Sequence, residues 1–195
     1  MPINRTVHCT FNCTANRAAG FTIIEVLVAM LVLAFGVIGS SAMQLTALRT
    51  RHQSSLLSSA LHLGSSMLDT MRANARQMQL SDADNPYLGL DDDALTHAAP
   101  AESGPTCFAQ CDSAQMAAFD IAQWKRQLRA IFPGGRFVIC RDAQVSDGAS
   151  TVWACSGGPA APVVIKLGWT ESGLGAAQQG GQRVMLVLTL TGAPT

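Results

Sequence analysis

The sequence has few charged residues and no basic cluster. Of its 195 residues, 13% are charged and 48% are hydrophobic, and 13 Lys and Arg residues balance 13 Asp and Glu residues. A nucleic-acid-binding surface needs Lys or Arg gathered on one face, so this composition argues against a nucleic-acid partner. The length suits one domain of ordinary size with an extension.

The sequence also lacks the residue spacings of a catalytic or metal site. His8, His52, His62 and His97 have neither triad nor metal-ligand spacing. The acidic run at residues 91–93 lacks the Gly and the terminal Glu of an EF-hand loop, so we predict that it lies in a solvated loop. We therefore predict no enzymatic activity, no cofactor and no metal.

Charge is almost absent from residues 21–43, where Glu25 is the only ionisable residue and no proline interrupts the segment. About 20 apolar residues are enough to cross a membrane. A carboxylate in the bilayer centre costs about 2.5–3.5 kcal/mol. The 12 Leu, Ile, Val and Phe residues of the segment favour insertion by about 4–7 kcal/mol. We predict a transmembrane helix, whose orientation the flanking arginines do not determine.

A short polar leader, residues 1–20, precedes this helix and contains two arginines but no acidic residue. A secretory signal peptide has its apolar core inside the removed piece, whereas here the apolar segment follows Gly20. The stretch GFTIIEVLVAM, Gly20 to Met30, closely resembles the class III signal of type IV prepilins and type II secretion pseudopilins. The resemblance implies that prepilin peptidase cuts between Gly20 and Phe21 and methylates the new amine of Phe21.

Glu25 would become the fifth residue of the processed chain, one helical turn from the amine of Phe21. The helix dipole favours an anion at this end of a helix. The resemblance implies that, in a pilus, this carboxylate neutralises the amine of an adjacent subunit. Our hypothesis is that Glu25 sets the subunit register during assembly.

The apolar residues narrow to one stripe after Gln44. Its members fall at steps of three or four, or twice four, along the chain: Leu45, Leu48, Leu56, Ala60, Leu63, Met67 and Met71. We predict one helix from Phe21 to about Met78, roughly 87 Å long, with residues 44–78 half-buried. Gly36 and Ser40 fit either close helix packing or a place where the helix loosens. The resemblance implies that this helix is the spine of a type IV pilin fold.

Residues 79–195 predict a globular domain with an α+β fold. Residues 79–106 are rich in turn formers and predict a loop. Asp112 and Gln115 fit a capping box that begins a second helix, which Pro133 ends. Its predicted buried face consists of Ala117, Ile121, Trp124, Leu128 and Ile131.

Four short apolar segments follow and predict an antiparallel sheet with one buried face. They are RFVIC from Arg136, TVWAC from Thr151, PVVIKLGW from Pro162 and RVMLVLTL from Arg183.

Four of the six cysteines follow the apolar segment: Cys107, Cys111, Cys140 and Cys155. Disulfides persist in oxidising compartments such as the periplasm. We therefore predict a single-pass inner-membrane protein with a periplasmic domain. Free thiols are the alternative, and the spacing matches no recognised zinc site. Of three possible connectivities we favour Cys140–Cys155 across a predicted hairpin, stabilising by about 3 kcal/mol, and Cys107–Cys111 as a local pair.

The downstream sequence narrows the family. The stretches AQMAAFDIAQWKRQLRAIFPGG and VVIKLGWTE are similar to the PilV minor pilin family, also called type IV pilus modification proteins. The matching residues are Asp120, Trp124, Pro133, Gly134, Gly135, Trp169, Thr170 and Glu171.

The PilV resemblance implies a minor pilin that primes assembly and supports twitching motility. Its implied partners are prepilin peptidase, other minor pilins, the major pilin and a pilus-tip adhesin, and it would be incorporated into the extracellular pilus. The main alternative is a minor pseudopilin of a type II secretion system. A plain membrane-anchored periplasmic domain, or an enzyme of unknown type, is a third interpretation.

Overall fold

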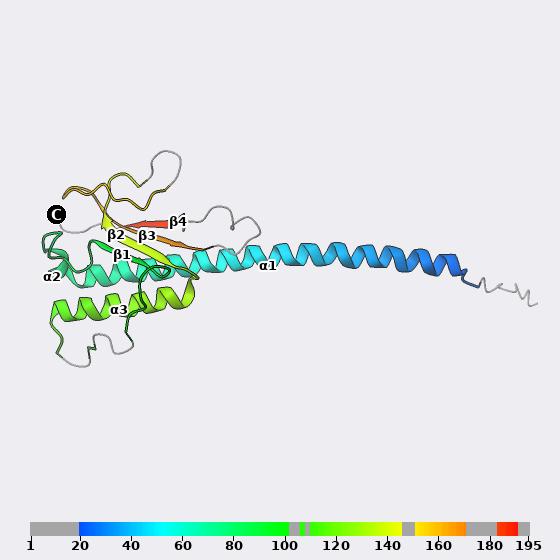
Figure 1. Cartoon of the computed structure of the whole chain (residues 1–195), viewed down its shortest axis with the longest axis horizontal. Helices are drawn as coiled ribbons and strands as arrows, with labels where there is room; N and C mark the ends of the chain where they lie inside the picture. The colour runs from blue at the N-terminus through cyan, green and yellow to red at the C-terminus, as the bar shows by residue number, and fades with distance from the viewer. Residues whose placement is uncertain (1–19, 102–105, 108–109, 146–150, 171–182, 191–195) are drawn as a thin grey trace, which may run out of the picture. The chain divides into compact units, whose positions relative to one another are not determined.

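The computed structural model describes residues 20–101, 106–107, 110–145, 151–170 and 183–190. The chain divides into two compact units, residues 1–48 and 49–195. The helices are α1 (Ile23–Ala73), α2 (Ala75–Met78) and α3 (Ser113–Ile131). The strands are β1 (Leu90–Asp93), β2 (Arg136–Arg141), β3 (Val163–Trp169) and β4 (Arg183–Thr189). A long apolar helix, a second helix and an antiparallel sheet (Figure 1) confirm the predicted α+β class and are consistent with a pilin fold.

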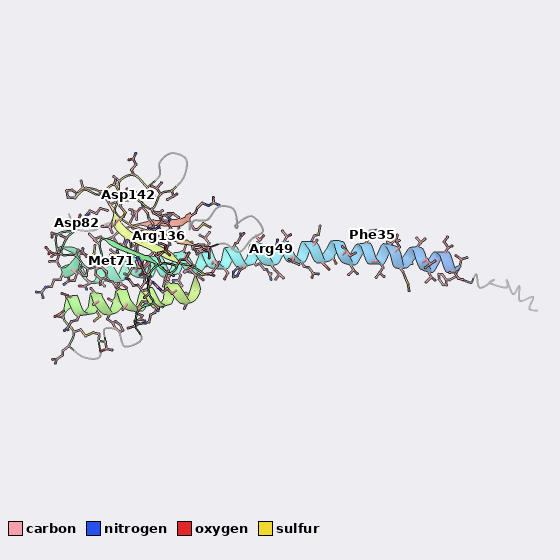
Figure 2. All side chains as sticks on the ribbon, viewed as in Figure 1. Phe35, Arg49, Met71, Asp82, Arg136 and Asp142 are labelled. Atoms are coloured by element: carbon pink, nitrogen blue, oxygen red, sulfur yellow. A yellow bond between two sulfur atoms is a disulfide. The ribbon has the colours of Figure 1, made fainter. Side chains whose placement is uncertain are left out.

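The first unit contains the apolar part of α1, residues 23–48. An 18-residue window of this helix has a mean hydropathy of 2.5, so α1 is long and apolar enough to cross a membrane. Its large side chains are exposed, as Phe35 is at 69% (Figure 2). The helix continues without a break through Gly36 and Gly39.

In the second unit, residues 49–73 of α1 pack into the core. The predicted stripe is buried at Ala60, Leu63, Met67 and Met71 and half-buried at Leu56, but its first two members, Leu45 and Leu48, are exposed. At Gly64 the helix backbone approaches the sheet so closely that a Cβ would collide with Leu188 of β4. A glycine at this helix position therefore allows the contact between α1 and the sheet.

The predicted continuous helix to Met78 is wrong, because α1 ends at Ala73 and Asn74 forms a turn before α2. The Asn74 side-chain amide donates to the Tyr87 hydroxyl at 3.1 Å and to the Ser113 carbonyl at 2.8 Å. Asn favours such bonds at helix ends over a place in the helix interior. Asn74 thus joins the end of α1 to the start of α3.

Helix α3 begins as predicted. The Asp112 carboxylate accepts from the backbone N–H groups of Ala114 and Gln115, and the Gln115 side chain accepts from the Asp112 N–H, which completes the capping box. Four of the five predicted core residues are buried, but Ile131 is 41% exposed. The chain becomes extended at Phe132, whose buried ring packs against Trp169 instead.

The sheet has the strand order β1-β2-β3-β4, with every neighbouring pair antiparallel. Residues 90–93, predicted to lie in a loop, form strand β1 and pair with β2 in the register Leu90↔Ile139 to Asp93↔Arg136. Asp is disfavoured in strands, and here two arginines compensate for it. Arg136 pairs with Asp91, and Arg129 of α3 pairs with Asp92.

The predicted strand at residues 151–155 is also wrong. Thr151 makes a single bridge and the following residues are irregular. Two of their carbonyl oxygens accept from the Lys166 side chain and not from a neighbouring strand. The sequence has strand-forming residues here, but the buried ammonium of Lys166 binds the carbonyl oxygens that would otherwise accept hydrogen bonds from a neighbouring strand.

Trp124 joins α3, α1 and the sheet in the main core. Its indole N–H donates to the Leu63 carbonyl at 2.9 Å, and its ring lies edge-on to Phe137, with centroids 4.6 Å apart. All seven residues of β3 are buried, so the prediction of one buried face is wrong for this strand. The second face carries a smaller cluster of Val138, Cys140 and Val164, against which Val145, Trp153 and Val187 pack.

Candidate assembly site

The predicted processing and assembly residues lie at the start of α1. Gly20 is exposed, and Phe21 is 83% exposed. The carbonyl and hydroxyl oxygens of Thr22 accept from the backbone N–H of Glu25, at 3.1 Å and 3.3 Å. A hydroxyl that accepts from the N–H three residues later is the bond of a helix N-cap, so Thr22 caps α1.

The cap brings Glu25 into the first turn of the helix. The first N–H groups of a helix have no partner inside it, and the dipole favours a negative charge there. The spacing Thr22-x-x-Glu25 is that of a capping box. Sequence reasoning used Glu25 but missed Thr22, although this spacing was the signal.

The predicted cysteines lie in the second unit and form two disulfides, Cys107–Cys111 and Cys140–Cys155. This is the connectivity that the sequence favoured. Cys140 ends β2 as predicted, but Cys155 lies in the irregular segment and not in a strand. The Cys107–Cys111 bond immediately precedes Asp112, the N-cap of α3. Cys9 and Cys13 of the leader lie outside the described residues.

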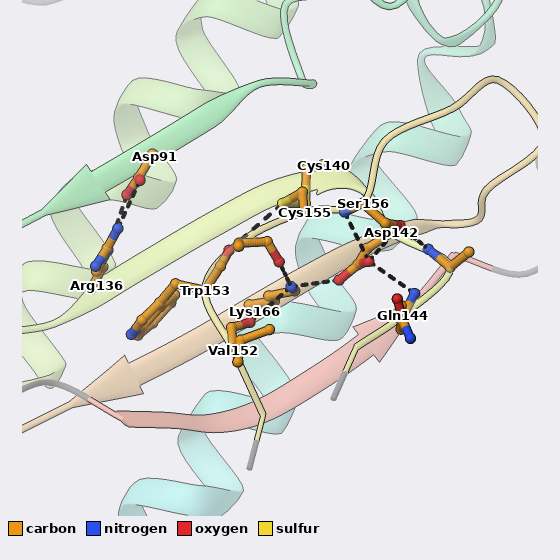
Figure 3. The surroundings of a disulfide bond; sticks show 12 residues. Asp91, Arg136, Cys140, Asp142, Gln144, Val152, Trp153, Cys155, Ser156 and Lys166 are labelled. Carbon is orange, nitrogen blue, oxygen red and sulfur yellow. Dashed lines mark hydrogen bonds and ion pairs between the residues drawn. A yellow bond between two sulfur atoms is a disulfide. The ribbon is translucent and has the colours of Figure 1, made fainter. Parts of the chain in front are cut away.

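A buried ion pair lies beside the second disulfide (Figure 3). Lys166 of β3 and Asp142 are both 0% exposed, and the Lys166 Nζ lies 2.5 Å from the Asp142 Oδ2. The Nζ also donates to the carbonyl oxygens of Val152, at 2.8 Å, and Ala154, at 2.6 Å. The ammonium, which has three donors, therefore contacts two carbonyl oxygens and one carboxylate. We call residues 142–145 and 151–156 the latch segment.

Asp142 holds the two ends of the latch segment together. Its Oδ1 accepts from the Gln144 N–H at 2.9 Å and from the Ser156 N–H and hydroxyl at 3.1 Å and 2.8 Å. Burial by itself would raise the pKa of Asp142. The hydrogen bonds from Lys166, Gln144 and Ser156 outweigh burial and hold the pKa well below its usual value. The carboxylate is therefore ionised at neutral pH.

Trp153 of the latch segment packs against the sheet. The Arg136 guanidinium lies 4.6 Å from the centre of the Trp153 ring, and it donates two hydrogen bonds to Asp91, at 3.1 Å and 2.8 Å. The ring also lies close to Gly168 of β3, where a Cβ would be 2.8 Å from a ring carbon. The absence of a side chain at Gly168 therefore leaves room for the Trp153 ring and for the Arg183 carbonyl oxygen of β4.

The sequence contained one sign of this arrangement. Lys166 is a single charge within the apolar run VVIKLGW, on the opposite face from Ile165 and Leu167. The alternating pattern predicted one buried face for this strand, and the prediction did not consider which groups Lys166 would bind on the other face. Asp142 gave no sign of its own, because its partner is distant in sequence.

Part of the downstream resemblance, around Pro133 and Trp169, comes together at one end of the sheet. The Thr170 N–H and hydroxyl both donate to the Pro133 carbonyl, at 2.9 Å and 2.8 Å. The rings of Phe132 and Trp169 stack with centroids 5.0 Å apart. Asp120 lies near Tyr87, at 3.5 Å from its hydroxyl, and Glu171 lies outside the described residues. The motif residues around Pro133 and Trp169 therefore form one packed corner, where the segment after α3 contacts the end of β3.

Among the residues that the structure describes, no group of three or more His, Cys, Asp or Glu side chains could hold a metal ion.

A family model described as the prokaryotic N-terminal methylation motif matches residues 15–41. The matched range includes Gly20, Phe21, Thr22 and Glu25 and the start of α1. The match supports the type IV prepilin superfamily and indicates a pilin-like or pseudopilin protein. Pilin-like proteins with this motif are of a structural, non-enzymatic kind. The motif implies processing by prepilin peptidase, anchoring in a membrane and assembly with other pilins. No curated protein and no solved structure matches the chain.

Proposed function

We propose that this chain is a minor pilin of a type IV pilus that helps to initiate pilus assembly at the inner membrane. The observation that carries the proposal is the N-terminal methylation motif at residues 15–41. This motif continues into a capped apolar helix with a single acidic residue in its first turn. The role is structural and not enzymatic.

In this proposal, prepilin peptidase removes the leader, residues 1–20, by cutting between Gly20 and Phe21. The new amine of Phe21 is then methylated. Residues 21–43 cross the inner membrane, while residues 44–78 and the globular domain, residues 79–195, lie in the periplasm until the subunit enters the fibre. Two disulfides in the second unit support an oxidising compartment.

Glu25 is the residue that couples processing to assembly. In the membrane its carboxylate is compensated by the amine of its own Phe21, one helical turn away. In the fibre the amine of an adjacent subunit takes over, so the correct register is the one that leaves neither charge unpaired. An unpaired carboxylate in an apolar medium costs several kcal/mol, which is large enough to select one register.

The likeness to the PilV family supports the assignment to minor pilins. The residues that carry it around Pro133 and Trp169 form one packed corner, so they constitute a structural unit and not scattered matches. The proposed partners are other minor pilins, the major pilin and a pilus-tip adhesin. We therefore expect the protein to contribute to twitching motility.

The test is to replace Glu25→Gln, which keeps the shape of the side chain and removes its charge. We expect normal membrane levels, normal cleavage and an N-methylated Phe21 by mass spectrometry. We expect at least about a tenfold loss of the protein from sheared pili, since about 1.4 kcal/mol of lost pairing suffices for this factor. Glu25→Asp, which keeps the charge, is the matched control and should retain more incorporation.

Wild-type levels of the Glu25→Gln protein in purified pili would contradict the assembly role. A chain that retains residues 1–20 in cells would contradict the processing pathway. If the variant blocked protein secretion while pili remained intact, the chain would be a minor pseudopilin of a type II secretion system.

A further inference from the structure

The two edges of the sheet differ in length and charge. Strand β1 has four residues, three of them Asp, whereas β4 has seven, with Arg183 as its only charge and no proline. Short, charged edge strands are protected against pairing with another chain. Within the described residues, β4 pairs with β3 alone.

The register shows which backbone groups of β4 point away from the sheet. The N–H of Leu190 donates to the Val163 carbonyl at 2.8 Å. Hydrogen-bonded and non-hydrogen-bonded pairs alternate in an antiparallel ladder. Leu188 and Leu186, paired with Ile165 and Leu167, therefore also bond to β3. The N–H and C=O groups of Val187 and Thr189 are directed outward.

The side chains at this edge are apolar and incompletely covered. The five residues from Val184 to Leu188 are all half-buried, in contrast to the fully buried β3. Leu186 and Leu188 pack on the main core, while Val187 packs on the smaller cluster of the opposite face. The only irregularity is a register shift beside Gly168, near the start of β4, so Leu186 to Thr189 form a regular stretch.

We propose that the β4 edge binds an extended strand of another subunit of the pilus assembly, which continues the sheet beyond β4. Outward N–H and C=O groups on a regular strand are complementary to one kind of partner, an extended backbone. Apolar side chains on both faces of this strand would cover the exposed parts of Leu186, Val187 and Leu188. An acidic residue opposite the exposed Arg183 would fix its register.

The proposal rests on the proposed function, because a low-copy subunit has other subunits as its neighbours in a fibre. The contrast between the edges supports the choice of β4. At β1, Asp91 and Asp92 are engaged by arginines, and a new strand there would lie beside three carboxylates. At β4 no comparable charge opposes pairing.

Thr189 provides a matched pair of variants. Its side chain is exposed, and its N–H points away from β3, so Thr189→Pro removes an outward donor without breaking a bond inside the sheet. Thr189→Ala removes the side chain but keeps the N–H. We expect the proline variant to be at least about tenfold depleted from sheared pili, with unchanged membrane level and thermal unfolding temperature. The alanine variant should assemble like the wild type.

Hydrogen exchange of the full processed chain gives a second measurement. In detergent micelles, the outward amides of Val187 and Thr189 should exchange faster than the inward amides of Leu186 and Leu188, and incorporation into pili should slow them. Protection of the outward amides in the monomer would mean that the chain covers its own edge. This would overturn the proposal, as would normal assembly of Thr189→Pro.

The remaining outcomes separate the two proposals. A wild-type dimer in detergent that Thr189→Pro abolishes would make a second copy the occupant and overturn pairing with a different subunit. If neither the wild type nor Thr189→Ala is found in pili, the proposed function fails, and the edge proposal, which rests on it, fails with it. If both assemble and Thr189→Pro also assembles, only the edge proposal fails.

Discussion

The two faces of the sheet are held by different forces. On one face, α1 and α3 cover a large apolar core that includes Met67, Trp124 and Phe137. On the other face, three buried residues among those described form the cluster around Val138, and a disulfide and the pair Lys166–Asp142 hold the latch segment there. Apolar area stabilises the helix face by itself. The described residues of the opposite face bury little apolar area, so a disulfide and an ion pair supply the stabilising interactions there.

This comparison explains why a charge can be buried completely in a strand. Removing an ammonium from water is costly unless its donors are all paired. Lys166 meets that condition with two carbonyl oxygens and one carboxylate. The contacts of Lys166 therefore tie Asp142, Val152 and Ala154 of the latch segment to strand β3.

The largest effect is expected from breaking the buried pair. Lys166→Met leaves the carboxylate of Asp142 buried without its cation, and such losses cost about 3–5 kcal/mol. Chemical denaturation of the detergent-solubilised chain, followed by tryptophan fluorescence, measures the change in free energy of unfolding. The double variant Lys166→Met with Asp142→Asn leaves no isolated charge and should lose less. An equal or greater loss in the double variant would show that charge isolation is not the cause.

A smaller effect is expected from the disulfides. Replacing Cys140 and Cys155 by Ser opens a loop with a sequence separation of 15, which should cost about 3 kcal/mol in the chain-entropy model. Replacing Cys107 and Cys111, with a separation of 4, should cost about 2 kcal/mol. Denaturation of both variants measures the difference.

Hydrogen exchange shows where the first of these losses acts. Without Cys140–Cys155, amides of the latch segment should exchange faster while those of α3 keep their protection. Equal acceleration in α3 would contradict the separation of the two faces.

The smallest effect is expected at the exposed pair Asp91–Arg136. Their side chains are 49% and 26% exposed, in contrast to the fully buried Lys166–Asp142. Solvent-exposed pairs contribute about 0.2–1 kcal/mol, so Asp91→Ala should change the unfolding free energy by no more than this. The same denaturation assay applies, with and without added salt. A loss above about 2 kcal/mol would mean that Asp91 is needed to form β1.

Local features of the fold were predictable from the sequence. The capping box at Asp112 and the buried positions up to Leu128 depend on spacing within α3, so the sequence alone identifies them. The class III signal is local in the same way, and a capping-box search would have found Thr22 as well. The sequence allows three pairings of the four cysteines. The pairing found was favoured because Cys140 and Cys155 were expected to lie in two strands of a hairpin, and Cys155 does not lie in a strand.

Long-range compensation was not predictable. Residues 91–93 look like a loop because Asp is a poor strand former. They form β1 because Arg129, far along the chain, donates to the Asp92 carboxylate at 2.9 Å and 3.2 Å. Residues 151–155 look like a strand, but Lys166 takes their carbonyl oxygens. In both cases the residue that decides the outcome lies in another element.

The starting point of α1 has a consequence for proteolysis. The helix begins at Ile23, so the bond between Gly20 and Phe21 precedes the first residue whose geometry is helical. A peptide bond inside α1 could enter a protease cleft only after the helical hydrogen bonds around it had been broken. The predicted scissile bond needs no such unwinding. Thr22, which caps α1, marks the last residue that a protease can bind in an extended conformation without unfolding the helix.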